Sequence, residues 1–373
     1  MAYKIIITAN TSWYLYNFRK NTILSLISKG YDVIAIAPKD EYSKKLEELG
    51  SAFSNIRIDQ GGVNPVSDLK TFINFIFLYM KFKPDIVLNF TPKNNIYSTL
   101  AAKFCKAKVI NNIAGLGMVF INESIIAKIA KFLYKISQYK ADKIFFQNED
   151  DRELFFENKL ANPLITERLP GSGVDLTRFS LQPSDDDGVV RFLLIARMIY
   201  DKGIGYYIEA ARILKNKYGN KVEFQLLGFI GVNNPSAVTK EDLQSWIDEG
   251  IVKYIGISDF VEKHIEKVDC MVLPSYYREG VPKSLLEAGA MGKPIITTDN
   301  VGCRETVDDG INGYLCKLRD TQSLVEKLEL IISMTHEERL AMGHQSRLKI
   351  EREFDEKIVI QKYLDTINKL LKK

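Results

Sequence analysis

One segment in the second half of the chain has charged residues in a pattern suited to a ligand with both phosphate and hydroxyl groups. Pro274 to Pro294 combines a loop of glycine and proline with two glutamates, Glu279 and Glu287. We expect a helix to open near Pro282 or Lys283, because a proline in the first turn loses no intrahelical hydrogen bond. Amides at a helix start favour an anion, and the helix dipole adds to that preference. The carboxylates would accept hydrogen bonds from sugar or ribose hydroxyls, and the amides that would face the anion are those of Val281, Lys283 and Ser284.

A second segment supplies two cations. Arg197 and Lys202 flank a loop between a predicted strand and a predicted helix. Arginine offers a planar fork and lysine a point charge, and together they suit a diphosphate. Taken alone the segment could be an ordinary basic loop, but its pairing with the glutamate segment favours a diphosphate site.

The elements that must position these residues alternate between short apolar runs and segments of helical period. Continuous β-branched runs between helices predict parallel sheets covered on both faces. The fold class we expect is α/β, with two Rossmann-like domains facing each other across a cleft and ligands bound beyond the carboxyl ends of the strands. The strands expected are 4–8, 32–37, 53–58, 86–90, 109–113, 143–146, 190–195, 223–227, 252–255, 270–273, 295–297 and 313–315, and the helices are 15–29, 42–49, 67–80, 94–105, 124–140, 149–158, 320–333, 336–353 and 356–372.

The length of 373 residues suggests two domains, at roughly 150 residues each. Clusters of Gly, Pro, Ser and Asp at 169–175 and 182–188 are the best linker candidates. We therefore expect an N-terminal domain over 1–175, a C-terminal domain over 176–355, and a last helix over 356–373 that packs back on the first domain.

The order of these motifs resembles glycosyltransferase family 4, the retaining enzymes of the GT-B fold. The resemblance covers nearly the whole chain. In the first domain, Tyr16–Arg19 and Gly115–Phe120 resemble bacterial members that build capsule, O-antigen or lipid-linked oligosaccharides. The motifs of the second domain are Arg197…Lys202-Gly203, Pro274-Ser275…Glu279-Gly280…Glu287-Ala288…Gly292-Lys293-Pro294, Gly302…Glu305 and Asp309-Gly310…Gly313.

The resemblance implies that the domain over 1–175 binds the acceptor and the domain over 176–355 binds the nucleotide-sugar donor. It also implies a role for each matching residue. Glu279 would hold hydroxyls of the donor sugar and stabilise the oxocarbenium-like transition state, and Glu287 would bind the ribose. Arg197 and Lys202 would stabilise the diphosphate leaving group in place of a divalent metal. Further donor contacts would come from the backbone of Gly280, Val281, Pro282, Lys283 and Ser284, and from loops at Gly228, Ile257 and Ser258 that flank the base.

The first domain departs from the family pattern. Many members have a histidine near the donor sugar, but the three histidines here, His264, His336 and His344, all lie in the second half, where we expect surface or packing roles. The turn after the first strand reads Ala9-Asn-Thr-Ser-Trp13 where glycines are common. Candidates for acceptor contacts in this domain are Asn10, Arg19, Lys93 and Asn112.

We expect neither a metal site nor a cofactor. The four cysteines show no metal-ligand spacing and are too sparse for a disulfide scaffold, which favours a reducing cytosol. No Asp-x-Asp motif follows a predicted strand, and Asp185–Asp187 lies in the linker region. No Gly-x-Gly-x-x-Gly follows the first strand, which argues against a dinucleotide fold.

The net charge of +4 hides a division between the two halves. Residues 1–180 have 24 Lys and Arg against 17 Asp and Glu, or +7, and residues 181–373 have 27 against 30, or −3. Lysines at 128, 131 and 135 align on one face of the helix predicted over 124–140, which is either a solvated stripe or a basic surface resting on anionic lipid. No segment reaches the roughly 20 apolar residues that a bilayer crossing needs. We expect a cytoplasmic protein at the inner face of the cytoplasmic membrane and no nucleic-acid partner.

The sequence thus predicts a metal-independent retaining glycosyltransferase of bacterial surface polysaccharide or glycan biosynthesis. The expected donor is a UDP-sugar, with an N-acetylhexosamine as one candidate, and the expected acceptor is a glycan or a polyprenyl-diphosphate-linked glycan. One alternative is an enzyme similar to UDP-N-acetylglucosamine 2-epimerase, which needs first-domain acid–base residues that we do not find. Another is a non-catalytic nucleotide-sugar-binding partner, against which Glu279, Arg197 and Lys202 count.

Overall fold

The computed structural model describes residues 2–59, 64–116, 125–182 and 186–372. The chain divides into two compact units, of which the first comprises Met1–Ser172 together with Lys357–Lys373 and the second comprises Gly173–Glu356. The chain passes from the first unit to the second between Ser172 and Gly173, inside the glycine-containing cluster 169–175 and three residues before the boundary that we expected from the sequence.

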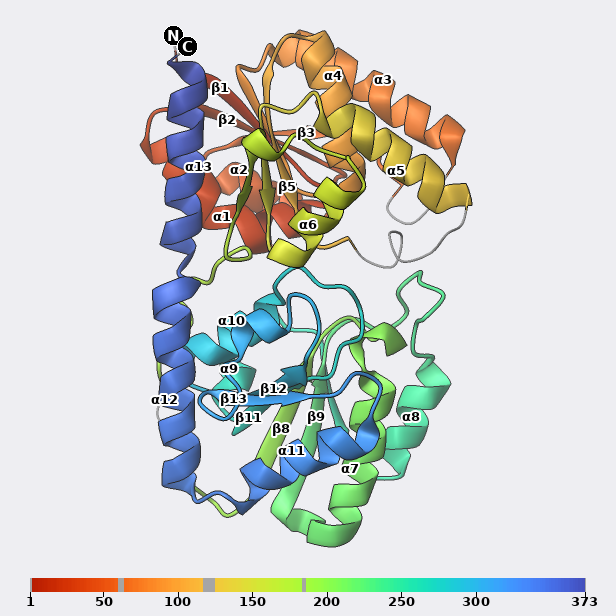
Figure 1. The fold of residues 1–373 in the computed structure, drawn as a ribbon, viewed down its shortest axis with the longest axis vertical. Helices are drawn as coiled ribbons and strands as arrows, with labels where there is room; N and C mark the ends of the chain where they lie inside the picture. Colours follow the sequence, from red (N-terminus) through yellow and green to blue (C-terminus); the bar gives the residue numbers. More distant parts are fainter. Residues whose placement is uncertain (1, 60–63, 117–124, 183–185, 373) are drawn as a thin grey trace. The chain divides into compact units, whose positions relative to one another are not determined.

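The first unit is built on a seven-stranded sheet (Figure 1). Every pairing in it is parallel, and the strand order is β3-β2-β1-β4-β5-β6-β7. The order reverses direction between β1 and β4, which makes their carboxyl ends the switch point of this sheet. The strands are β1 Lys4–Thr8, β2 Asp32–Ala37, β3 Ala52–Asn55, β4 Ile86–Asn89, β5 Lys108–Ile113, β6 Lys143–Phe146 and β7 Thr166–Arg168.

Two apolar cores lie on the two faces of this sheet. Successive side chains of a strand point to opposite faces, so Ile6 belongs to one core while Ile5 and Ile7 belong to the other. The core of Ile6 is covered by α3 Pro65–Phe82, α4 Thr99–Phe104, α5 Ile125–Gln138 and α6 Glu149–Glu157. The opposite core is covered by α1 Ser12–Ser28, α2 Tyr42–Glu48 and the last helix, α13 Glu356–Leu371.

The second unit is built on a six-stranded parallel sheet of order β10-β9-β8-β11-β12-β13. Its switch point lies between β8 and β11. Its strands are β8 Val190–Ile195, β9 Val222–Leu227, β10 Lys253–Gly256, β11 Cys270–Leu273, β12 Ile295–Thr298 and β13 Gly313–Cys316. Its helices are α7 Ile204–Tyr218, α8 Lys240–Asp248, α9 Glu262–Ile265, α10 Lys283–Ala290, α11 Thr321–Ser333 and α12 His336–Glu353, among which α7 packs on α11 and α10 packs on α12.

All twelve strands expected from the sequence are present, and the fold class is confirmed. The expectation was wrong in detail at several places, of which β7 and the helix over 94–105 are two. β7 was missed because Thr-Glu-Arg carries no apolar run, and the helix expected over 94–105 is divided into a π-helical turn, Asn94–Ser98, and α4. In that turn the carbonyl of Asn95 accepts bonds from the Thr99 hydroxyl and the Gln138 amide, which replace regular helical hydrogen bonds.

Candidate active site

The two charged segments of the second unit come together at the switch point of its sheet. Lys202 lies in the loop that follows β8, and Glu279 lies in the loop that follows β11, which is the neighbouring strand. Parallel strands end at the same edge, so two loops distant in sequence become adjacent there. The helix expected near Pro282 or Lys283 begins at Lys283, as predicted.

Lys202 and Glu279 form an ion pair. Their side chains are only 12% and 10% exposed, and the pair is therefore largely shielded from water. The same carboxylate oxygen accepts a hydrogen bond from the Ser275 hydroxyl at 2.9 Å. Ser275 is fully buried and was not given a role from the sequence, although it stands inside the quoted motif. The arrangement fixes one lysine charge and one carboxylate side by side at the edge of the sheet.

Tyr277 connects this pair to Arg197. The Lys202 ammonium lies 5.0 Å from the centre of the Tyr277 ring, in the range of a cation–π contact. Burial raises the pKa of the Tyr277 hydroxyl, the charge of Glu279 raises it further, and the charge of Arg197 opposes the rise. Arg197 itself is exposed at the surface of the unit. The two cations expected to face a diphosphate therefore both interact with Tyr277, Lys202 through its ring and Arg197 through its charge.

Two glycines hold the loops of the site against each other. Gly203 has φ +81°, and a β-carbon there would lie 2.0 Å from the carbonyl oxygen of Pro274. Gly302, with φ +77°, lies after β12, and a β-carbon there would lie 1.5 Å from the carbonyl oxygen of Gly280. Both backbones approach more closely than any side chain allows, and only glycine is unstrained at these positive φ angles. The residues beside Lys202 and Glu279 are thereby fixed by main-chain contacts.

Side chains that follow β12 also hold the loop of Ser275 and Tyr277. The Thr298 hydroxyl donates to the Ser275 carbonyl, and the Asn300 amide donates to the Tyr277 carbonyl at 2.9 Å. Sequence reasoning missed both residues because neither lies within a recognisable motif. Buried side-chain bonds to backbone carbonyls restrict the loop to one conformation.

Glu287 occupies a second, separate environment on α10. It is buried, and burial raises the pKa of its carboxyl, while the charges of Lys283 and Arg178 oppose the rise. Lys283 lies 3.8 Å away, one helical turn earlier. Arg178 is held by Glu262 at 2.8 Å and by the carbonyl of Asp259 at 2.6 Å. Hydrogen bonds from the hydroxyls of a nucleotide ribose would stabilise the charged form of a carboxylate in this position.

The loops expected to flank a base follow β9 and β10. The Gly228 amide donates to the Gly256 carbonyl at 2.8 Å, and the Tyr254 hydroxyl donates to the Gly228 carbonyl at 2.7 Å. The Phe260 amide donates a hydrogen bond to the Ser258 hydroxyl, and Ile257 is exposed at the surface. Phe229 and Phe260 are also exposed here and add apolar surface that sequence reasoning did not single out.

In the first unit, Asn10 and Lys93 follow the two strands of the switch point, β1 and β4. Lys93 forms an ion pair with Asp68 of α3 at 2.6 Å, and the other oxygen of Asp68 accepts the Tyr97 hydroxyl at 3.0 Å. Lys93 thus has a structural partner that the sequence did not indicate. Asn10 is half-buried at the turn.

Arg19 and Asn112 are both buried. The Arg19 guanidinium is 1% exposed, stacks on the Phe90 ring at 4.2 Å and donates to Ser172 at 3.1 Å. Its position is explained by packing within the unit. The Asn112 side chain is buried on β5, and neither of its polar atoms has a hydrogen-bond partner among the described residues. The Gly115–Phe120 motif lies outside the described residues from position 117 onward.

Within the described part of the chain there is no cluster of three or more metal-ligating side chains. The four cysteines are free, and burial raises the pKa of Cys303 and of Cys316 to about 12. The helices among the described residues are all too short or too polar to span a bilayer.

Comparison with known proteins gives matches over both units. The family model of group 1 glycosyl transferases matches residues 190–334, and the model described as glycosyl transferase 4-like matches residues 4–148. N,N'-diacetylbacillosaminyl-diphospho-undecaprenol alpha-1,3-N-acetylgalactosaminyltransferase of Campylobacter jejuni is 29% identical, with 96% of each chain covered. The capsular polysaccharide biosynthesis glycosyltransferase CapM of Staphylococcus aureus is 26% identical, with 88% of each covered.

Solved structures share the fold over the whole length. HepE of Anabaena, in complex with UDP-glucose, superposes with a TM-score of 0.79 at 14% identity, over 98% of this chain and 99% of that one. The two parallel sheets and this likeness define a GT-B protein. With both family models matched, the chain belongs to glycosyltransferase family 4 and is a glycosyltransferase, as its motifs predicted.

Proposed function

We propose that the protein transfers a sugar from a UDP-sugar to an undecaprenyl-diphosphate-linked glycan, with retention of anomeric configuration and without a bound metal ion. The observation that carries the proposal is the shielded Lys202–Glu279 ion pair at the β8–β11 switch point, beside Arg197. The Campylobacter relative, whose name gives a diphospho-undecaprenol acceptor and an alpha linkage, supports the acceptor and the stereochemistry. The bound UDP-glucose of HepE supports the donor class.

The proposed chemistry divides charge between two ends of one bond. Breaking the bond between sugar and phosphate leaves positive charge on the anomeric carbon and negative charge on the departing diphosphate. Lys202 and Arg197 would stabilise the diphosphate, and Glu279 would hold the donor sugar. The two cations would do the work of a divalent metal, and such preorganised charges act strongly where water is excluded.

Binding of the remaining parts follows from the same loops. Glu287 would accept the ribose hydroxyls, the main chain of Gly280 to Ser284 would contact sugar and phosphate, and the loops of Gly228 and Ile257 would flank the base. Residues of the first unit, Asn10, Lys93 and Asn112 among them, would contact the acceptor. The proposed location is the cytoplasmic face of the membrane, where a polyprenyl-linked acceptor is anchored, with the lysines of α5 facing anionic lipid.

A donor scan tests the proposal. The protein is incubated with UDP-GalNAc, UDP-GlcNAc, UDP-galactose or UDP-glucose and an undecaprenyl-diphosphate-linked disaccharide, with UDP release as the readout. We expect release that requires the acceptor, favours an N-acetylhexosamine and is unchanged by EDTA, and an alpha-linked product by NMR. A beta-linked product would exclude retention, and loss of turnover in EDTA would exclude metal independence.

The alternatives give different results in the same assay. Interconversion of UDP-sugar epimers without UDP release would indicate a 2-epimerase. Nucleotide-sugar binding without turnover on any donor would indicate a non-catalytic partner. Glu279→Ala, which should remove most turnover, tests the assignment of the site.

A further inference from the structure

The helices on one face of the first sheet carry large apolar side chains that no core explains. On α3 the exposed residues of this kind are spaced by three or four positions and therefore form one stripe along the helix. Phe77 is 66% exposed, although a phenylalanine in a soluble protein is normally buried. The residues of the stripe are Val66, Leu69, Ile73, Phe77 and Met80.

The stripe is not the side of α3 that packs on the sheet. Thr71, Phe75 and Tyr79 are buried against the core, and they lie on the opposite side of the helix. A helix that covers a core normally has one apolar stripe and an opposite polar face. α3 has apolar side chains on both, so its outward face suits an apolar environment outside the unit.

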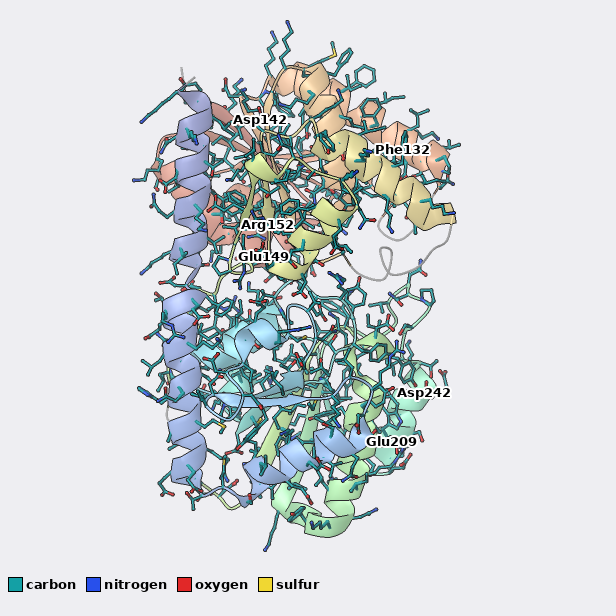
Figure 2. The ribbon with its side chains drawn as sticks, viewed as in Figure 1. Phe132, Asp142, Glu149, Arg152, Glu209 and Asp242 are labelled. Atoms are coloured by element: carbon teal, nitrogen blue, oxygen red, sulfur yellow. The ribbon has the colours of Figure 1, made fainter. Side chains whose placement is uncertain are left out.

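The neighbouring helices extend this surface. α3 and α5 both contact the π-helical turn Asn94–Ser98, and α4 contacts both helices, so the three form one layer (Figure 1). Phe132 of α5 is 62% exposed (Figure 2), and Phe104 of α4 is exposed as well. The exposed apolar residues of α5 and the turn after it again repeat at three or four positions: Ile129, Phe132, Ile136 and Tyr139. The outward residues of α3, α4 and α5 together are called the apolar–basic face below.

Lysines alternate with these apolar side chains. Lys70 and Lys81 on α3 and Lys128 and Lys135 on α5 are exposed on the same sides as the apolar residues. Over residues 71–140 the sequence has ten lysines against two acidic residues. Asp68, the acidic residue of α3, is buried and paired with Lys93, so it does not offset the lysines outside.

A hollow beside α3 adds two more cationic side chains, Lys39 and Arg57, to Lys70. It is lined by Lys39, Arg57 and Asp59 from the loops after β2 and β3, and by Lys70, Ile73 and Asn74 of α3, so that three cations face one carboxylate. Ile73 belongs to the apolar stripe, so the hollow adjoins the apolar–basic face. Cations beside exposed apolar groups match a phosphate headgroup above acyl chains.

We propose that the apolar–basic face binds the surface of a bilayer that contains anionic phospholipid, with Phe77 and Phe132 inserted among the lipids. This deepens the proposed function, on which it rests, because it moves the main membrane contact from the lysines of α5 to the stripe of α3. A second copy of the chain fits less well, because a two-fold contact would set the lysine-rich face against itself.

The test is flotation with vesicles of phosphatidylcholine alone or of phosphatidylcholine mixed with the anionic lipid phosphatidylglycerol. The wild-type chain should float with the anionic vesicles at low salt, and less at high salt. Phe77→Glu/Phe132→Glu should lower the partition coefficient at least about tenfold, since both lost insertion and added charge oppose binding. Each Lys→Gln change at 70, 81, 128 or 135 should lower it about fivefold.

Leu24→Glu on α1 is the matched control, because Leu24 is an exposed apolar residue on the opposite face of the same sheet. It should float as the wild type does. Thermal unfolding of all variants checks that they fold. Equal flotation of the double variant and the wild type, no flotation with any vesicle, or a wild-type dimer that the double variant abolishes would each overturn the proposal.

Activity separates this proposal from the proposed function. With a short-chain, water-soluble diphosphate-linked acceptor, the double variant should keep wild-type turnover, whereas with undecaprenyl acceptor in vesicles it should lose most of it. If no donor gives turnover with either acceptor, the proposed function fails while flotation still decides the membrane contact.

Discussion

Gly302 allows a direct test of how the Glu279 loop is held. We consider Gly302→Ala together with Gly310→Ala, because both glycines have φ +77°. A β-carbon at Gly302 would lie 1.5 Å from the Gly280 carbonyl oxygen, whereas a β-carbon at Gly310 would meet nothing within 4 Å. The two variants therefore share the backbone strain and differ in the clash.

The magnitudes follow from this difference. An alanine in the left-handed region costs roughly 1–2 kcal/mol, which both variants should show as lower stability. At Gly302 the carbonyl must also move from 1.5 Å to at least 3.0 Å, a shift of about 1.5 Å, and overpacking of this kind costs roughly 1–3 kcal/mol more. Displacement of a catalytic loop by about 1 Å can cost about 100-fold in rate, so kcat of Gly302→Ala should fall about 100-fold or more. Gly310→Ala should keep its kcat.

The assay is UDP release at saturating donor and acceptor, with thermal unfolding of each variant in parallel. Activity is measured well below the unfolding temperature of the weaker variant, so that the loss of folded protein does not enter. If Gly302→Ala kept kcat within about threefold of Gly310→Ala, the Gly302–Gly280 contact would not position Glu279, and our account of the site would be refuted.

Three further perturbations address single side chains. Lys202→Met should lower kcat about 10²–10³-fold, because the leaving diphosphate loses a cation and Glu279 its partner; a change in KM alone would contradict this role. Burial raises the pKa of Glu287, so its ribose-binding carboxylate is protonated as the pH falls through a value above the usual 4.5, and the UDP affinity measured by calorimetry should fall there. Glu287→Gln should bind UDP more weakly and with less dependence on pH. A variant whose UDP affinity changed with pH as the wild type's does would exclude the assignment. Lys93→Met should destabilise the fold by roughly 3 kcal/mol, since buried Asp68 loses its ion pair, and adding Asp68→Asn should restore most of the lost stability. If the double variant recovers stability but has a raised KM for the acceptor, Lys93 also contacts the acceptor. If Lys93→Met does not destabilise the fold at all, the pair is not structural.

The local order of apolar runs was enough to predict every strand of both sheets except β7. Ile5, Ile6 and Ile7 illustrate why: a strand buried on both faces is apolar throughout, and such a run is visible without knowledge of its neighbours. β7 was missed for the converse reason, as Thr166–Arg168 is short and polar and joins the sheet only by pairing with β6. The exposed stripe on α3 was also missed, because a doubly apolar helix looks in sequence like a helix that is wholly buried.

By itself the sequence determined the two-domain α/β class and the family. It also determined the charged residues of the donor segments, which include Glu279, Arg197 and Lys202. These are encoded in residue type and local spacing. Only the tertiary structure decided which of these side chains meet: that Lys202 pairs with Glu279, that Ser275 and Asn300 hold the loop, and that Lys93 pairs with Asp68. For the contacts of Lys202 and Asn300 the physical reason is that they join loops far apart in the chain, which the strand order of a parallel sheet brings to one edge.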